Sequence, residues 1–266
     1  MRKWPSVILL LILILGAVLE VRVSRHDYAY QDREATMQQA SPDHLAGTDE
    51  LGRDRLVRVA AALLIGLTGA MAAAAITITI AATVGLLAAF SPSPIAAILM
   101  FVSDSFLTVP WLFLLMTARS LLPLTASPLQ TAVATFLVLA LFGWPACARA
   151  ICGGATTMRS AESMIQGRAC GLRNRQLIRV HVLPHLRPLL LPQFLVCVPA
   201  FLVAEANLGA LGLGVGEPMP SWGAMLLELD NSALLAQSHW VYLPIAMLVL
   251  VLVLLESFTS EAERNA

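Results

Sequence analysis

The sequence predicts an all-α membrane protein with six transmembrane helices. Hydrophobic residues make up 58% of its 266 positions and charged residues only 13%, whereas charged residues make up roughly 25% of soluble domains. Residues 59–103, 120–148 and 231–255 carry no charge, and about 20 apolar residues are enough to cross the hydrocarbon core as a helix. Few aromatic residues and no alternating ten-residue segments argue against a membrane β-barrel.

The six predicted spans cover residues 4–22, 60–89, 95–117, 129–151, 189–210 and 239–257. The first lacks the small-residue cleavage pattern of a signal peptide, so we expect it to be retained. The second is too long for a core of ~30 Å, so we expect its start to lie outside the core or along the membrane surface. Ser91-Pro92-Ser93-Pro94 predicts a tight turn into the third span. Proline inside four of the spans predicts kinks, at Pro110, Pro145, Pro199 and Pro244.

The distribution of basic residues predicts that both termini are cytoplasmic. Arg2 and Lys3 precede the first span, and six Arg lie in the loop 152–188, which six spans place on the same side. The opposite side receives residues 24–58, where Arg is mixed with seven acidic residues. The sequence thus divides into an N-terminal helix (1–23), a periplasmic segment (24–58), a core with five helices (59–258) and a cytoplasmic tail (259–266).

The polar segment 159–187 is basic and patterned like a helix. We predict a helix over 158–170, a break at Gly171, a second helix over 174–182, and Pro184 at the start of the next element. Glycine suits the position after a helix, where φ is positive. Two short helices would fit a docking element for a soluble partner, but composition equally allows a connecting loop whose Arg residues only set topology.

No catalytic or metal site is expected. The chain lacks H-E-x-x-H, and Pro184 lies between His181 and His185. G-x-S-x-G and a phosphate-binding loop are also missing. The cysteines form no C-x-x-C pair, which indicates buried structural thiols rather than a zinc site or a disulfide framework: Cys147, Cys152, Cys170 and Cys197.

Two acidic residues fall inside predicted spans, Asp104 in the third and Glu205 late in the fifth. A charge near the middle of a bilayer costs at least ~2.5 kcal/mol on insertion scales, so such residues usually face a partner helix or a watery cavity. Both are candidates for a translocation path or for helix packing.

Four segments in register resemble a known family. Residues 159–184, with Gly171 thirteen residues before Pro184, resemble the cytoplasmic EAA loop of ABC-importer permeases. His181-Val182-Leu183-Pro184 is similar to the dipeptide, oligopeptide and nickel group. The flanking matches are Gly47-Thr48-Asp49-Glu50-Leu51-Gly52-Arg53-Asp54, Asp104 with Pro110, and the run Ala204-Glu205-Ala206-Asn207-Leu208, Leu211-Gly212-Leu213-Gly214 and Pro220-Ser221-Trp222-Gly223.

The resemblance implies the type I, MetI-like architecture in a bacterial inner membrane. It implies a non-catalytic subunit that forms half of a path for peptides, a related small solute or nickel. The implied partners are a homologous second permease, two cytoplasmic ATPase subunits that hold ATP and magnesium, and a periplasmic or lipid-anchored binding protein. The ATPase-docking residues would be Glu162, Ser163, Met164, Ile165, Gln166, Gly167, Arg168, Ala169, Gly171 and Pro184.

The chain departs from the family pattern in two places. Ile165-Gln166-Gly167 replaces Glu-Ala-Ala, and Glu162, about one turn earlier, is a possible substitute acid. The sixth span ends in Glu256-Ser257-Phe258-Thr259 rather than N-L-x-G-D-x-L-R-D. Two alternatives stay open: a secondary transporter or channel that works alone through Asp104 and Glu205, and a membrane scaffold with degenerate motifs. The net charge of zero gives no sign of a nucleic-acid partner.

Overall fold

The computed structural model describes residues 4–121, 126–159, 161–172, 174–177, 183–230 and 239–263. Within these residues the chain is helical, apart from loops and an isolated bridge between Thr48 and Asp54. Five helical segments are long and apolar enough to cross a membrane, and a bent helix pair makes a sixth if it is counted as one span. The predicted all-α membrane fold is therefore confirmed.

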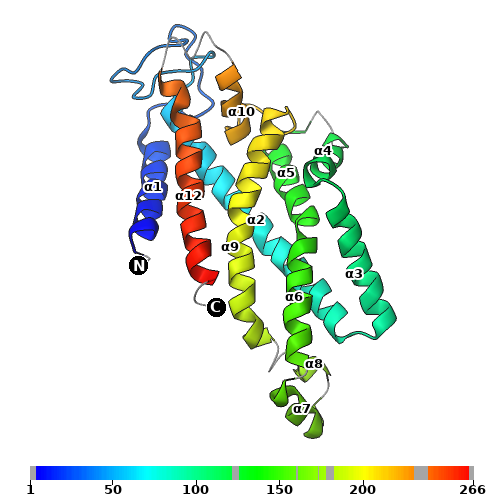
Figure 1. The fold of residues 1–266 in the computed structure, drawn as a ribbon. Helices are drawn as coiled ribbons and strands as arrows, with labels where there is room; N and C mark the ends of the chain where they lie inside the picture. Colours follow the sequence, from blue (N-terminus) through cyan, green and yellow to red (C-terminus); the bar gives the residue numbers. More distant parts are fainter. Residues whose placement is uncertain are drawn as a thin grey trace.

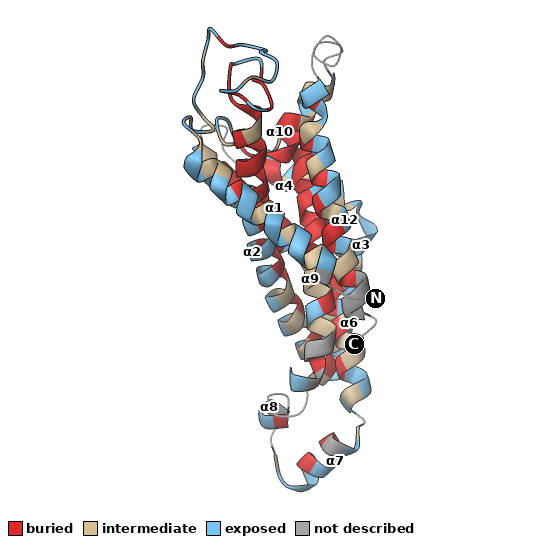
Figure 2. Ribbon diagram, turned by 90° about the vertical axis from the view of Figure 1, so that its left-hand side faces the viewer, coloured by how far each residue is buried: buried red, intermediate tan, exposed pale blue. Residues whose placement is uncertain are grey.

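Helix α2 (Arg55–Phe90) is the central element of the bundle. It runs diagonally behind α9 (Leu183–Ala210), and it packs mainly against α6 (Trp144–Arg159), α9 and α1 (Trp4–Val23) (Figure 1). Fully buried alanines on α2, such as Ala70, Ala74 and Ala81, allow this close packing because small side chains let helix backbones approach. Buried residues gather along the inward faces of the bundle, whereas α1 is mostly exposed (Figure 2).

The second predicted span is one continuous helix of 36 residues. Its first turn is buried beneath the segment 24–54, so the extra length lies in a folded part of the protein. The predicted turn at Ser91 to Pro94 is confirmed, since α2 ends at Phe90 and α3 (Ser93–Thr108) begins two residues after Ser91.

The prediction of a single kinked helix over 95–117 is wrong. Helix α3 ends at Thr108, and α4 (Trp111–Ser120) leaves it at an angle of 89°. Val109 is extended (φ −87°, ψ 131°) because the ring of Pro110 disfavours helical backbone at the preceding residue. The fourth span is also divided, at Gly143, into α5 (Pro128–Phe142) and α6, and it continues to Arg159.

The polar loop departs from its prediction as well. A continuous helix over 158–170 is wrong: α6 ends at Arg159 and α7 (Glu162–Ala169) is a separate helix. The break allows Met164 to turn into the core, where it is 1% exposed. The second predicted helix appears as α8 (Asn174–Leu177), and its remainder, 178–182, lies outside the described residues. Pro184 falls in the first turn of α9.

The molecule has two distinct ends. The loop end carries α7 and α8, which project beyond the other helices (Figure 1). The cap end carries the segment 24–54 together with α10 (Trp222–Leu226) and the 3₁₀ turn η2 (Leu227–Asp230). After η3 (His239–Tyr242), α12 (Leu243–Glu263) descends beside α1, and both chain termini point toward the loop end.

Candidate functional site

Helix α7 at the loop end has a buried face and an exposed face. Met164 and Gly167 are buried toward the bundle. The other face is exposed, with Ile165 leaving 59% of its surface free. We call this exposed face the docking stripe; its members follow helical i, i+3, i+4 and i+7 spacing and are Glu162, Ile165, Gln166 and Ala169. The side chains of Ser163 and Arg168 lie outside the described part of the chain.

Hydrogen bonds mark the C-terminal end of α7 and the preceding end of α6. Gly171 has φ +80°, as predicted, and the amide of Leu172 donates to the carbonyl of Gly167 at 3.1 Å, which is the hydrogen bond of a Schellman motif. On the other side, the Arg159 guanidinium donates to the carbonyl of Ala89 at 3.3 Å, at the C-terminal end of α2. The docking stripe is thus carried by a short helix with a defined C-terminal cap, which follows an end of α6 that is bonded to α2.

An acid is still present on the stripe although Ile165-Gln166-Gly167 replaces Glu-Ala-Ala. The Glu162 carboxylate accepts a long hydrogen bond, 3.5 Å, from the amide of Gln166 one turn later. Both side chains are exposed. The stripe therefore presents one carboxylate beside the apolar side chain of Ile165.

At the cap end, the Gly47 to Asp54 motif folds into a compact turn. Gly52 has φ +73°, and a Cβ there would lie 1.8 Å from the carbonyl oxygen of Asp32, so only glycine fits. The Asp49 carboxylate accepts from the amide of Arg53 at 2.8 Å and from its Nε at 2.6 Å. Asp54 caps α2 by accepting from the amide of Leu56 at 2.8 Å.

This turn is linked to the segment that precedes α12. Arg53 contacts Glu217 at 2.5 Å, Arg58 contacts the same carboxylate at 3.3 Å, and Arg55 contacts Glu228 at 2.9 Å. Burial alone would lower the pKa of Arg53, but the Asp49 and Glu217 carboxylates raise it above its usual value. Burial also raises the pKa of Glu228, against the opposing effect of Arg55. These pairs give partners to three Arg of the segment 24–58, and sequence analysis did not identify them.

Glycines in the motif run between Ala204 and Gly223 allow three backbone segments to touch. A Cβ on Gly223 would lie 2.4 Å from Gly209 Cα, and one on Gly214 would lie 2.5 Å from the same atom. Ser221 caps α10 by accepting from the amide of Ala224 at 3.1 Å, and Trp222 is fully buried next to Gly66 of α2. The motif therefore closes the cap over the end of α9.

The two acidic residues singled out within the spans have different surroundings. Glu205 is 1% exposed and lies below the cap, near Ser221 and Trp222. Among the described residues, neither of its carboxylate oxygens has a partner that meets hydrogen-bond geometry. Glu205 thus occupies an internal position rather than an open surface.

Asp104, by contrast, is half-exposed and forms an ion pair. An Nη of Arg149, on α6, donates to its carboxylate, and the two side chains keep 46% and 52% of their surfaces exposed. Sequence analysis missed Arg149. The signal was present, because a lone Arg inside the fourth span can neutralise a lone Asp inside the third.

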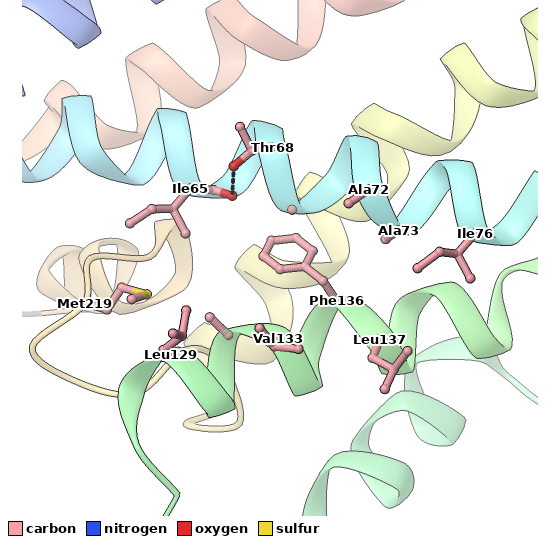
Figure 3. A pocket seen from close by; sticks show the side chains of 12 residues that line it. Ile65, Thr68, Ala72, Ala73, Ile76, Leu129, Val133, Phe136, Leu137 and Met219 are labelled. Atoms are coloured by element: carbon pink, nitrogen blue, oxygen red, sulfur yellow. Dashed lines mark hydrogen bonds between the residues drawn. The ribbon is translucent and has the colours of Figure 1, made fainter.

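Two grooves open among the membrane-length helices. One, of about 480 Å³, lies between α4, α9 and α12, and its lining includes Trp111, Leu115, Val203, Asn207, Leu252 and Glu256. The other, of about 370 Å³, lies between α2 and α5 and is almost wholly apolar (Figure 3). There the Phe136 ring lies against Gly69, and the hydroxyl of Thr68 donates to its own helix at the carbonyl of Leu64.

The described residues contain no group of three or more His, Cys, Asp or Glu placed to hold a metal ion. Cys147 and Cys197 are buried free thiols 3.7 Å apart, as expected for structural cysteines. Cys170 is exposed, which contradicts that expectation, because it follows the end of the projecting α7.

Comparison with known proteins gives consistent matches. Residues 81–259 match the family described as binding-protein-dependent transport system inner membrane component. The chain is 30% identical over 264 residues to an oligopeptide transport system permease protein, OppC, of Mycobacterium tuberculosis, covering 98% of this chain and 88% of that protein. It is 29% identical to the dipeptide transport system permease protein DppC of Bacillus subtilis, covering 87% and 70%. The solved structure of the MetNI methionine ABC transporter, in inward-facing form, superimposes with a TM-score of 0.59 at 16% identity over 77% of this chain and 94% of that chain.

Proposed function

Since this chain belongs to the family of binding-protein-dependent transport system inner membrane components and is a transmembrane permease subunit of an ABC importer, we propose that it forms half of a path for peptides, and that α7 docks on cytoplasmic ATPase subunits. The observation that carries the docking proposal is the docking stripe: Ile165 and Glu162 are exposed on a projecting helix whose opposite face is buried. A surface of this kind suits insertion into a groove of another protein.

Coupling between the ATPase and the membrane helices would depend on how α7 is connected to the rest of the chain. It is joined to α6 on one side, and after α8 the chain enters α9 on the other. A force on the docking stripe would therefore be transmitted to α6, which precedes α7 in the chain, and through α8 to α9. The ATPase can shift the permease between inward and outward access only if it contacts the two states with different free energies. The chain itself would be non-catalytic, with ATP and magnesium held by the partner subunits.

The proposed cargo is a peptide or a related small solute, with nickel as the alternative. The relatives named for oligopeptide and dipeptide transport support this assignment. A second, homologous permease would complete the path, and two ATPase subunits would bind at the loop end. A periplasmic or lipid-anchored binding protein would deliver the solute at the cap end, where the proposed outer face consists of residues 24–58 and 213–238; of these, 231–238 lie outside the described residues.

The docking proposal is tested with Ile165→Asp in the complete complex. Ile165 is 59% exposed, so the substitution should not disturb folding, but it would place an unpaired carboxylate in a buried interface. We expect recovery of the ATPase subunits with the chain to fall by roughly tenfold or more, which corresponds to ~1.4 kcal/mol. The matched control is Leu45→Asp at the cap end, where the side chain is 60% exposed.

Equal loss of the ATPase subunits in both variants would point to general damage, and undiminished recovery with Ile165→Asp would reject the docking stripe. Solute transport by the isolated chain in liposomes would instead support a transporter that works alone.

A further inference from the structure

The ion pair between Asp104 and Arg149 lies near the middle of the bundle's length. Arg149 is ten residues before the end of α6 at Arg159, and Asp104 is eleven residues after the start of α3 at Ser93. Both helix ends belong to the same side of the bundle as the loop end (Figure 1). At ~1.5 Å per residue the pair is ~15 Å from that side, close to the midplane of a hydrocarbon core of ~30 Å.

Two half-exposed charges at this depth do not suit a surface that faces lipid. Charged side chains in membrane helices usually point to a bundle interior or a watery cavity. Several other exposed side chains on α3 are large and apolar, for example Ile98 at 62% and Phe101 at 71%. The face that carries the ion pair is therefore expected to meet water or another subunit.

The groove between α4, α9 and α12 begins on the helix that follows α3. Asp104 lies on α3, and the groove residues Trp111 and Leu115 lie on α4, after the bend at Pro110. On α6, Cys147 contacts Cys197 of α9 and lies two residues before Arg149, which places Arg149 on nearly the opposite side of the helix. Arg149 therefore points away from α9 and toward α3, and the ion pair forms a surface separate from this groove.

We propose that Asp104 and Arg149 recognise the two charged ends of a zwitterionic solute as it passes the midplane. The pair opens, Asp104 accepts hydrogen bonds from the ammonium group of the solute, and Arg149 donates to its carboxylate. One ion pair is exchanged for two, so neither the protein charges nor the solute charges are left unpaired where water is scarce. The planar guanidinium suits a carboxylate because it can donate two parallel hydrogen bonds. This inference rests on the proposed function in peptide import.

The test uses the complete complex, reconstituted in liposomes with its ATPase subunits, second permease and binding protein. Uptake of trialanine, a peptide with free termini, is measured at saturating binding protein together with ATP hydrolysis. The double variant Asp104→Asn with Arg149→Gln should lower uptake by roughly tenfold, because charge-assisted hydrogen bonds to both ends are lost. Stimulation of ATP hydrolysis by the loaded binding protein should change less than about twofold, since α7 is untouched.

Further variants separate recognition from a merely structural tether. The conservative pair Asp104→Glu with Arg149→Lys keeps both charges in place and should retain most of the uptake. The exchanged pair Asp104→Arg with Arg149→Asp keeps an ion pair between α3 and α6 but reverses its polarity, so it should stay defective. The control is Ser105→Ala, next to Asp104 on α3, where the exposed hydroxyl donates to the carbonyl of Phe101 in its own helix, so uptake should be unchanged.

Normal uptake by the neutral pair, or full recovery by the exchanged pair, would overturn recognition of the solute. Loss of both uptake and stimulated hydrolysis in the neutral pair, with the conservative pair equally defective, would show a structural role and also overturn it. If the unmodified complex hydrolyses ATP but takes up no peptide, the proposed cargo fails, and this inference fails with it.

Discussion

At the scale of single residues, glycine positions explain why the cap motifs have their spacing. Gly209, Gly214 and Gly223 come from α9, the loop after it and α10, and their backbones touch. A side chain on any of them would separate segments that must close over Glu205 and Trp222. Their role is therefore steric.

This predicts that Gly223→Ala destabilises the folded protein. Its Cβ would meet the carbonyl oxygen of Ala206 and the Cα of Gly209, both at 2.4 Å, and backbone atoms cannot rotate away. Overpacking of this kind costs ~1–3 kcal/mol or more, so the midpoint of thermal unfolding in detergent should fall. Gly153→Ala is the control, because a Cβ there has no atom within 4 Å and alanine favours the helix. Equal midpoints for the two variants would contradict the steric role.

At the scale of elements, the cap is joined to the bundle by ion pairs whose Arg side chains are buried. The side chain of Arg55, on the first turn of α2, is 4% exposed, and that of its partner Glu228, in η2, is 19% exposed. The Asp49 carboxylate pairs with Arg53, and both Arg53 and Arg58 pair with the Glu217 carboxylate. Elements far apart in sequence are thus joined at one end of the molecule.

Arg55→Ala should therefore destabilise the protein strongly, by ~3–5 kcal/mol at neutral pH, because it leaves the Glu228 carboxylate buried without its cation. Burial raises the pKa of Glu228, and the Arg55 guanidinium opposes this rise. Without Arg55 the pKa of Glu228 would rise further. A raised pKa in the folded state lowers stability as pH increases through it. The deficit should consequently shrink as pH falls through the raised pKa of the folded state, and it should be smallest below pH ~4.3, where this carboxyl is protonated in both states.

Unfolding midpoints at two pH values, for the parent and for Arg55→Ala, measure this difference. The exposed pair Arg25 and Asp43 provides the control, since Arg25→Ala should have little effect at either pH. A deficit that does not change with pH would mean that lost packing of Arg55, rather than its charge, explains the effect.

The elements also show how far sequence reasoning reaches. Composition and apolar runs correctly predict the all-α membrane fold, and the motif resemblance correctly predicts its type I permease architecture. The Ser91 to Pro94 turn and the positive φ of Gly171 are also predicted correctly. Pro110 predicts where the third span breaks, but the 89° angle depends on what α4 packs against. The break before α7 was missed because it depends on the burial of Met164 in the same core as Leu177 and Leu186.

Pairings between distant residues were the least accessible to sequence analysis. Glu217 lies 164 residues after Arg53, and Arg149 lies 45 residues after Asp104. A single sequence gives no indication that Arg53 and Glu217 meet, and for Asp104 and Arg149 it shows only two lone opposite charges in successive spans. Local chemistry fixes turns and caps, whereas the partners of buried charges are set by the packing of whole helices.

At the scale of the whole molecule, the sequence motifs lie at opposite ends of the helix bundle. The Gly47 to Asp54 turn and the residues 211–223 build the cap end, while α7 and Gly171 build the loop end (Figure 1). Between them, the Asp104 and Arg149 pair lies near mid-length. This arrangement suits a subunit that receives solute at one end and a mechanical signal at the other.

The arrangement predicts which residues can be labelled from each side of the membrane. Single cysteines are introduced at Gln38, in the cap end, and at Asn174, at the start of α8, in a background lacking the four native cysteines. We expect a membrane-impermeant thiol reagent to label position 38 in intact cells and position 174 only after the membrane is opened, because the Arg-rich loop is retained on the cytoplasmic side. Opening the membrane with detergent serves as the control for reactivity at both positions. Labelling of position 174 but not of position 38 in intact cells would reverse the orientation and place the docking stripe on the side without ATP.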